Sequence, residues 1–206
     1  MQKEAPAREV VLASNNAGKL REFSAILGEA GITMIAQGTL GVSEAEEPHL
    51  TFIENAIAKA RHASQHTGRP ALADDSGLCV PALGGAPGVY SARYASMGGG
   101  EKSDLANNLR LLSHLKSVDD HRAYYVAVLA YLEGPDDPCP LVAEGRWYGE
   151  VVATPRGDNG FGYDPHFWLP ERGCTVAELD PVEKNRSSHR AKALAALLKR
   201  MREASA

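Results

Sequence analysis

The sequence predicts an α/β protein built on a mixed β-sheet with flanking helices. Strand-like and helix-like segments alternate along the 206 residues, and two apolar runs, residues 124–132 and 141–148, are separated by a turn of Gly, Pro and Asp. Alternation favours parallel strands covered by helices, whereas a hairpin adds an antiparallel pair to the sheet. The length suits one compact domain, or two lobes that share a cleft.

The first half of the chain alternates short strands with amphipathic helices. Apolar residues at helical spacing continue to Gly31, which is well placed to end a helix in the left-handed conformation. Thr51 and Glu54 have the spacing of a capping box. The predicted elements are a strand over 9–13, a helix from Leu20 to Gly31, a strand over 33–37, a helix from Thr51 to about Ser64 and a strand over 71–74.

The second half is richer in turns. Gly, Pro and Ala dominate residues 76–100, which predicts a long loop region, and another glycine-rich loop follows at 157–162. Leucines at helical spacing predict a third helix that Ser103 or Asp104 would cap. The predicted elements are that helix over 105–115, the hairpin strands over 124–132 and 141–148, and a closing helix from about Ser188.

Composition and charge exclude several classes of protein. With 44% apolar and 23% charged residues, the chain can bury a sizeable core. Its 22 Lys and Arg against 26 Asp and Glu give a net charge of −4, so we expect no general binding to nucleic acid or to a membrane. Three scattered cysteines give no support for a disulfide framework or a zinc site. No apolar run approaches membrane-spanning length, and we expect a cytoplasmic protein.

The turn after the first predicted strand is a candidate phosphate site. It ends in Gly-Lys, but Ala13 and Leu20 depart from the P-loop pattern. Backbone donors at a helix N-terminus, an asparagine amide and a lysine ammonium would still bind an anion. The alternative is an ordinary capped turn between a strand and a helix. The turn comprises Ser14, Asn15, Asn16, Ala17, Gly18 and Lys19.

Acidic residues occur together at two places. Asp74 and Asp75 follow an apolar strand, where successive side chains point to opposite faces, so one carboxylate should enter the site while the other supports the loop. Carboxylates without neighbouring His or Cys suit a hard cation such as Mg²⁺, which bridges substrate phosphates. The acidic stretch 44–47 could supply a second ligand. For both segments the alternative is a solvated acidic loop.

Two later segments combine aromatic, glycine and basic residues. Residues 160–165, Gly-Phe-Gly-Tyr-Asp-Pro, could pack a nucleobase and read its edge with backbone groups, or form a hydrophobic plug under a turn. Residues 184–190 carry Lys184, His189 and Arg190 before the last helix. Cations at a helix N-terminus oppose its dipole, which favours a bound anion or ligand over capping alone.

Together these segments resemble the inosine triphosphate pyrophosphatase family, also called Ham1-like, along nearly the whole chain. Six motifs occur in the family's order, and the ordered set is far more specific than any one motif. They lie at residues 14–19, 52–60, 73–78, 85–94, 161–165 and 183–190.

The resemblance implies a fold and an activity. The fold would be a single ITPase-like domain over residues 1–206, with an elongated mixed sheet and two lobes around a central cleft. The protein would be a homodimer that requires Mg²⁺. The activity would be hydrolysis of the deaminated purine triphosphates ITP, dITP and XTP to the monophosphate and pyrophosphate, which cleanses the nucleotide pool.

The resemblance also implies roles for individual residues. Asp75 would be the essential carboxylate, either as general base or as metal ligand, with Glu46 as its partner at the metal and Glu47 as the alternative. Lys59, which by its position alone would be a surface lysine, would help Asn16 and Lys19 to hold the phosphates. Ser76 would touch the substrate, and the base pocket would comprise Phe161, Gly162, Tyr163, Asp164, Lys184, His189 and Arg190.

Selectivity and two competing activities follow from the same residues. Donors at His189, Arg190 or the pocket backbone would pair with the 6-oxo group of inosine and xanthine and leave the 6-amino group of adenine unpaired. A pyrophosphatase for pyrimidine or modified nucleotides could use the same carboxylate and lysines, but residues 188–190 argue against it. A nucleotide sensor without turnover is disfavoured by Asp75 and its acidic partner loop.

Overall fold

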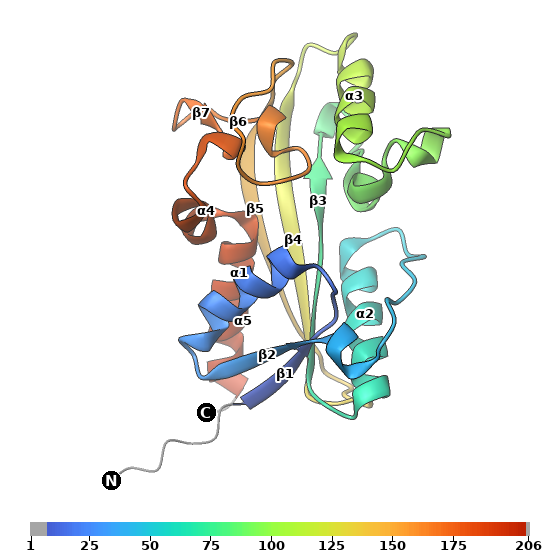
Figure 1. The fold of residues 1–206 in the computed structure, drawn as a ribbon, viewed down its shortest axis with the longest axis vertical. Helices are drawn as coiled ribbons and strands as arrows, with labels where there is room; N and C mark the ends of the chain where they lie inside the picture. The colour runs from blue at the N-terminus through green and yellow to red at the C-terminus, as the bar shows by residue number, and fades with distance from the viewer. Residues whose placement is uncertain (1–7, 205–206) are drawn as a thin grey trace. The chain divides into compact units, whose positions relative to one another are not determined.

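The computed structural model describes residues 8–204. Their seven strands form one sheet in the order β2-β1-β3-β4-β5-β6-β7 (Figure 1). Strand β1 is parallel to β2 and β3, whereas β6 is antiparallel to β5 and β7. The predicted mixed sheet is therefore confirmed. The strands are β1 (Arg8–Leu12), β2 (Ile32–Ala36), β3 (Ala71–Cys79), β4 (Arg122–Leu132), β5 (Leu141–Val151), β6 (Phe167–Leu169) and β7 (Cys174–Thr175).

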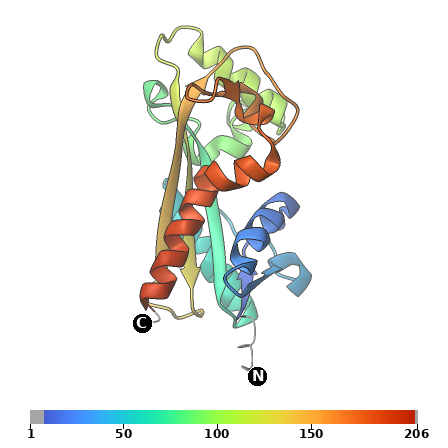
Figure 2. The ribbon, with the colours of Figure 1, turned by 90° about the vertical axis from the view of Figure 1, so that its left-hand side faces the viewer.

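Helices flank this sheet, as the sequence predicts. Helix α1 packs on β2, as the blue segments of Figure 2 show, and helix α2 contacts β1. Within residues 8–204, no helix is long and apolar enough to cross a membrane. The helices are α1 (Ala17–Gly28), α2 (Phe52–Thr67), α3 (Asp104–Leu115), α4 (Pro181–Ser187) and α5 (His189–Ala204).

The chain divides into two compact units. Unit 1 contains the described residues up to Asp75, residues 128–144 and the described residues from Ala193; unit 2 contains residues 76–127 and 145–192. Strands β3, β4 and β5 each continue from one unit into the other along the chain. A single domain with two lobes and a central cleft stays a prediction.

Unit 1 is built around β1 and the helices that follow it. Val11 and Leu12 of β1 are fully buried, as is Phe23 of α1, because β1 lies between two other strands and under a helix. Asn16 caps α1 by accepting from the Lys19 N–H at 3.0 Å. Helices α1 and α2 therefore both begin at a side-chain cap, since Thr51 caps α2 in the same way.

Unit 2 has an aromatic core. Tyr125, Trp147, Tyr163 and Phe167 are buried in one cluster with aliphatic residues of β3, α3 and the end of β5. The rings of Tyr125 and Phe167 lie 4.5 Å apart, which is a favourable distance for an aromatic pair. This core underlies the residues that the sequence assigns to a base pocket.

Two local predictions are wrong, and one helix was not predicted. Strand β3 does not end at Asp74 but continues to Cys79, because apolar Leu78 and Cys79 extend the buried run beyond the polar residues. Helix α1 ends at Gly28, and Gly31, at φ 75°, lies three residues later. The sequence patterns also predict no helix over residues 181–187, which form helix α4, starting at a proline after the cap Asp180.

Candidate active site

A buried lysine connects three acceptors in unit 1. The ammonium of Lys59, on α2, donates to Asp75 Oδ1 at 2.7 Å, to Glu47 Oε1 at 2.8 Å and to the Asp74 carbonyl at 3.0 Å. Three acceptors match the three N–H groups of an ammonium. The interpretation of Lys59 as a surface lysine is therefore wrong: it is 9% exposed and lies at the centre of the acidic residues.

The protonation of this cluster reflects its burial. Burial raises the pKa of Asp75 above the usual aspartate value, and the Lys59 ammonium offsets only part of this rise. Burial alone would lower the pKa of Lys59, but the charges of Asp75 and Glu47 outweigh it and raise that pKa. Asp75 is thus a stronger base than an exposed aspartate.

Asp74 and Asp75 are bound by different helices. Lys19, near the start of α1, lies 2.9 Å from Asp74 Oδ2, whereas Lys59 of α2 reaches Asp75. Adjacent side chains of a strand point to opposite faces, which is why the two carboxylates meet different lysines. Both aspartates lie in the middle of β3 rather than at its end. The carboxylates are therefore fixed by a strand and not by a loop.

The acidic stretch contributes one residue to this cluster. Glu47 contacts Lys59, whereas Glu46 is exposed. The structure thus places Glu47, the predicted alternative to Glu46, beside Asp75. Within the described part of the chain, no group of three or more His, Cys, Asp or Glu side chains is arranged to hold a metal ion.

The turn that the sequence assigns to phosphate is a capped helix start. Ser14 Oγ accepts from the Asn16 N–H at 3.2 Å, and the Asn16 side chain in turn caps α1. Asn15, Asn16 and Ala17 are exposed, while Ser14, Gly18 and Lys19 are partly buried. The turn therefore presents exposed polar and backbone groups at a helix N-terminus, and its binding of phosphate stays a prediction.

A second buried ion pair organises unit 2. Asp164 Oδ2 accepts from Lys184 Nζ at 2.7 Å and from the Phe161 N–H at 3.0 Å, and Oδ1 accepts from the Tyr125 hydroxyl at 3.0 Å. Burial and the nearby carboxylate raise the pKa of Tyr125 well above its usual value, so its hydroxyl remains a donor. Because both oxygens of Asp164 are occupied by protein donors, this residue acts as an anchor within the protein.

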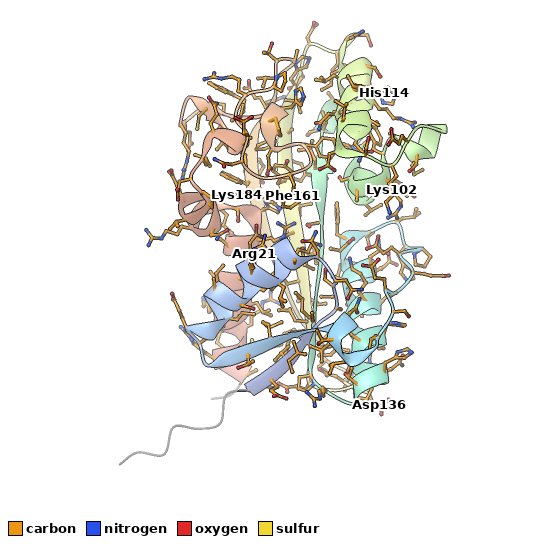
Figure 3. All side chains as sticks on the ribbon, in the orientation of Figure 1. Arg21, Lys102, His114, Asp136, Phe161 and Lys184 are labelled. Carbon is orange, nitrogen blue, oxygen red and sulfur yellow. The ribbon has the colours of Figure 1, made fainter. Side chains whose placement is uncertain are left out.

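Phe161 stands beside two cations. Lys184 Nζ lies 4.8 Å from its ring centroid and Arg190 Cζ lies 5.6 Å away. Phe161 and Lys184 are labelled in Figure 3. The ring is 47% exposed, so the alternative of a hydrophobic plug is wrong for this residue. Tyr163, by contrast, is buried and donates from its hydroxyl to the Ser91 carbonyl at 2.8 Å.

The basic segment is divided between two helices. Lys184 lies in the last turn of α4, where a cation agrees with the helix dipole, so the argument that its charge needs a ligand is wrong for this residue. His189 and Arg190 open α5 and are buried. The His189 ring stacks on Tyr125 at 4.8 Å, and Arg190 Nη2 donates to Ser76 Oγ at 3.1 Å.

Sequence reasoning missed two buried asparagines near these groups. Asn55 of α2 donates to Asp75 Oδ2 at 3.4 Å, and it exchanges two hydrogen bonds with the backbone of His49, which fixes the acidic stretch. Asn108 of α3 donates to the Gly162 carbonyl at 2.8 Å. Asparagine is a poor helix former, so an asparagine among the apolar residues of a predicted helix is a sequence feature that could have indicated a role for Asn55 and Asn108.

Comparison with known proteins identifies relatives of this chain. The sequence model of the protein family described as "Ham1 family" matches residues 10–200. A Bordetella pertussis protein named dITP/XTP pyrophosphatase is 66% identical over 195 residues, covering 95% of this chain and 92% of that protein. A Burkholderia pseudomallei protein of the same name is 64% identical over 200 residues, covering 97% and 96%.

Solved structures give the same result. The structure of a HAM1 protein from Coxiella burnetii superposes with a TM-score of 0.88 at 47% identity, covering 95% of this chain and 99% of that one. The Staphylococcus aureus Ham1 protein superposes with a TM-score of 0.83 at 41% identity, covering 97% and 100%. The pattern match and these likenesses extend over nearly the whole chain, which therefore belongs to the Ham1 family.

Proposed function

We propose that this protein hydrolyses the deaminated purine nucleoside triphosphates ITP, dITP and XTP to the monophosphate and pyrophosphate, and so removes them from the nucleotide pool. The observation that carries the proposal is the Asp75 carboxylate, buried in the middle of β3 and bonded to Lys59, in a chain of the Ham1 family. The names of relatives at 57% to 66% identity support the substrate class.

The proposed reaction breaks the bond between the α-phosphorus and the oxygen that bridges to the β-phosphorus. A water oxygen forms the new bond to the α-phosphorus while Asp75 accepts a water proton, and the electron pair of the broken bond leaves with pyrophosphate. The raised pKa of Asp75 suits it to accept this proton. Lys19, Lys59 and the exposed turn at residues 14–18 would bind the phosphates and offset their charge.

We include a Mg²⁺ requirement in the proposal. The Asp75 and Glu47 carboxylates are neighbours, because each accepts from the Lys59 ammonium, at 2.7 and 2.8 Å. Two neighbouring carboxylates fit Mg²⁺, which keeps several waters and takes its other ligands from phosphates. Asp75 and Glu47, rather than the exposed Glu46, would hold the ion, whose charge would stabilise negative charge on the phosphates.

The purine would bind at the aromatic and basic residues of unit 2. The exposed Phe161 ring offers a stacking surface, and the backbone at Gly162 and Tyr163 forms the loop beside it. Donors at His189 and Arg190 would pair with a 6-oxo group, whereas the 6-amino group of adenine would leave them without an acceptor. Lys184 would complete this pocket, and Ser76, which receives the Arg190 hydrogen bond, would touch the substrate.

A homodimer in the cytoplasm completes the proposal. Leu105 and Leu109, one turn apart on α3, are 69% and 59% exposed, and Met97 is 54% exposed. A second copy would bury these side chains. Light scattering should then give twice the chain mass of 22.0 kDa, and Leu109→Glu should give the monomer.

The free state of all three cysteines supports a reducing compartment, which fractionation of cells would test.

A turnover assay tests the function directly. The purified protein is incubated with Mg²⁺ and ITP, dITP, XTP, GTP, ATP or dTTP at neutral and alkaline pH, and pyrophosphate is separated from orthophosphate. We expect pyrophosphate, with a strong preference for ITP, dITP and XTP. Orthophosphate as product, a preference for dTTP, or binding of ITP without turnover would each contradict the proposal.

A further inference from the structure

Two residues of α3 bind both sides of one glycine in the aromatic loop. The Gly162 N–H donates to Asp104 Oδ2 at 2.8 Å, and the Gly162 carbonyl accepts from Asn108 Nδ2 at 2.8 Å. Asp104 and Asn108 are four residues apart and therefore lie on one face of the helix. We call Asp104 and Asn108 the Gly162 clamp.

Stability alone does not account for Asn108. It is 6% exposed, and among the described residues its Oδ1 has no hydrogen-bond partner. A buried acceptor without a partner is unfavourable, and an apolar side chain at this position would avoid that cost. The Nδ2 group donates both to Gly162 and to the Asp104 carbonyl. The bond to the loop is thus the feature that an asparagine provides here.

The rest of the loop is held as firmly. The Phe161 N–H donates to Asp164, and the Tyr163 hydroxyl donates to Ser91. Gly162 has φ 62°, a conformation that suits glycine, and the clamp bonds to the peptide groups on both sides of it. Consecutive residues are therefore fixed, while the Phe161 ring stays exposed.

We propose that Asp104 and Asn108 are positioning residues for the nucleobase: they fix the peptide groups of Gly162 and so set the orientation of the Phe161 ring against the purine. This inference rests on the proposed function. A loop that is already ordered loses less conformational entropy when the base binds. Loss of the clamp should therefore weaken base binding, whereas cleavage of the phosphate bond, which uses Asp75 and Lys59, should continue.

The first test compares two neighbouring asparagines. Asn107 is also buried on α3, but its side chain bonds to the Ala92 carbonyl and the Ala95 N–H instead of the aromatic loop. We expect Asn108→Ala to raise KM for ITP about tenfold and to leave kcat within about twofold, as for loss of one well-placed hydrogen bond. Asn107→Ala should change neither by more than about twofold. The thermal melting temperatures of both variants provide the control for stability.

The second test separates the acceptor at Asp104 from its charge. Asp104→Asn and Asp104→Ala both remove a negative charge from the first turn of α3, but only the asparagine keeps an oxygen that can accept from Gly162. We expect KM for ITP to rise about fivefold in Asp104→Ala and to stay near the wild-type value in Asp104→Asn. Calorimetric titration with IMP, which lacks the scissile bond, should show the same pattern in Kd.

The outcomes separate the two proposals. If wild type neither hydrolyses ITP nor binds IMP, the proposed function fails and the role of the clamp falls with it. If wild type is active but Asn107→Ala and Asn108→Ala shift KM and the IMP Kd equally, only the inference about the clamp is overturned. A fall in kcat at unchanged KM in Asn108→Ala would also overturn it, because the loop would then act on the chemical step.

Discussion

Two buried lysine–aspartate pairs in this molecule have the same separation. In unit 1, Lys59 Nζ lies 2.7 Å from Asp75 Oδ1, and in unit 2, Lys184 Nζ lies 2.7 Å from Asp164 Oδ2. In each pair the lysine comes from a helix, and all four residues are at most 9% exposed. Geometry and burial alone would assign both pairs the same role.

Their surroundings differ. The unit 1 pair is bordered by two further acceptors, the Glu47 carboxylate and the Asp74 carbonyl, and by one further donor, the Asn55 amide. The unit 2 pair is bordered by two further donors, the Tyr125 hydroxyl and the Phe161 N–H. The first group therefore has one carboxylate more than the Lys59 charge balances, and the second has a single carboxylate that accepts from three protein donors. Surplus charge suits a base or a cation ligand, whereas a carboxylate with three protein donors holds a loop in place. The neighbours of an ion pair, more than its length, thus indicate its role.

The largest test of this comparison removes each aspartate's charge. We expect Asp75→Asn to lower kcat for ITP about 1,000-fold or more, as for loss of a general base, without lowering the melting temperature by more than a few degrees. Asp164→Asn, the matched variant in unit 2, should lower kcat by less than about tenfold and act mainly on KM. Equal losses of kcat in both variants would remove the distinction between the two pairs.

The free energy of unfolding of variants that lack each lysine tests whether negative charge is in excess around Asp75 but not around Asp164. Lys59→Met leaves Asp75 and Glu47 without their shared cation and should lower the free energy of unfolding at pH 8 by about 3 kcal/mol. Lys184→Met should cost about 1 to 2 kcal/mol, because Asp164 keeps two other donors.

The pH dependence gives the sign of this effect. Without Lys59, the already raised pKa of Asp75 rises further above its unfolded value, so the charged carboxylate destabilises the fold at high pH and ceases to do so once protonated. Urea unfolding at pH 5 and pH 8 should therefore show a smaller loss for Lys59→Met at pH 5. A loss that grows on acidification would contradict the assignment.

Arg190 tests the base-binding side of the comparison. Arg190→Ala should raise KM for ITP about tenfold and change kcat/KM for ATP by less than about threefold, because only a 6-oxo base would use its donors. Steady-state kinetics with both nucleotides measure this difference. Equal effects on ITP and ATP would place Arg190 at the phosphates or in the fold instead, where its bond to Ser76 would be the relevant contact.

The smallest predicted effect is a shift in the pH profile. Burial raises the pKa of Asp75, and the Glu47 charge adds to this rise, so we expect the acidic limb of kcat/KM to lie above the range of an ordinary aspartate. Glu47→Gln removes that charge and should move the acidic limb to lower pH by less than about one unit, whatever happens to the plateau. Glu46→Gln, at the exposed neighbour, is the control and should leave the limb in place. A limb that moves to higher pH in Glu47→Gln would contradict this interpretation.

Much of the fold could be predicted from the sequence because local patterns specify it. Thr51 and Ser103 cap the helices where the spacing predicts them, and the two long apolar runs form adjacent strands β4 and β5. The end of β3 could not be predicted in this way. Asp74 to Gly77 have low strand propensity, and only their burial and tertiary partners keep them extended.

The site residues were predictable by type more than by contact. Asp75 and the aromatic loop were found from motifs, but the choice between Glu46 and Glu47 depends on which side chain reaches Lys59, which spacing does not determine. For the same reason, the sequence did not show that Asp164 accepts from three protein donors. Contacts between residues far apart in the chain carry that information.

The continuous strand β3 has a consequence for protein engineering. Asp75 and Ser76 are successive residues of one hydrogen-bonded strand, whereas the residues proposed to recognise the base come from the loop at 160–164 and from α4 and α5. Rigid elements hold functional groups more accurately than loops do, and loops tolerate exchange better. Within residues 157–163, Gly157, Gly160 and Gly162 have positive φ and would be strained by a side chain, whereas Asp158 and Phe161 are exposed. A library at Asp158 and Phe161 would therefore sample new nucleotide preferences while the cleavage chemistry keeps its scaffold.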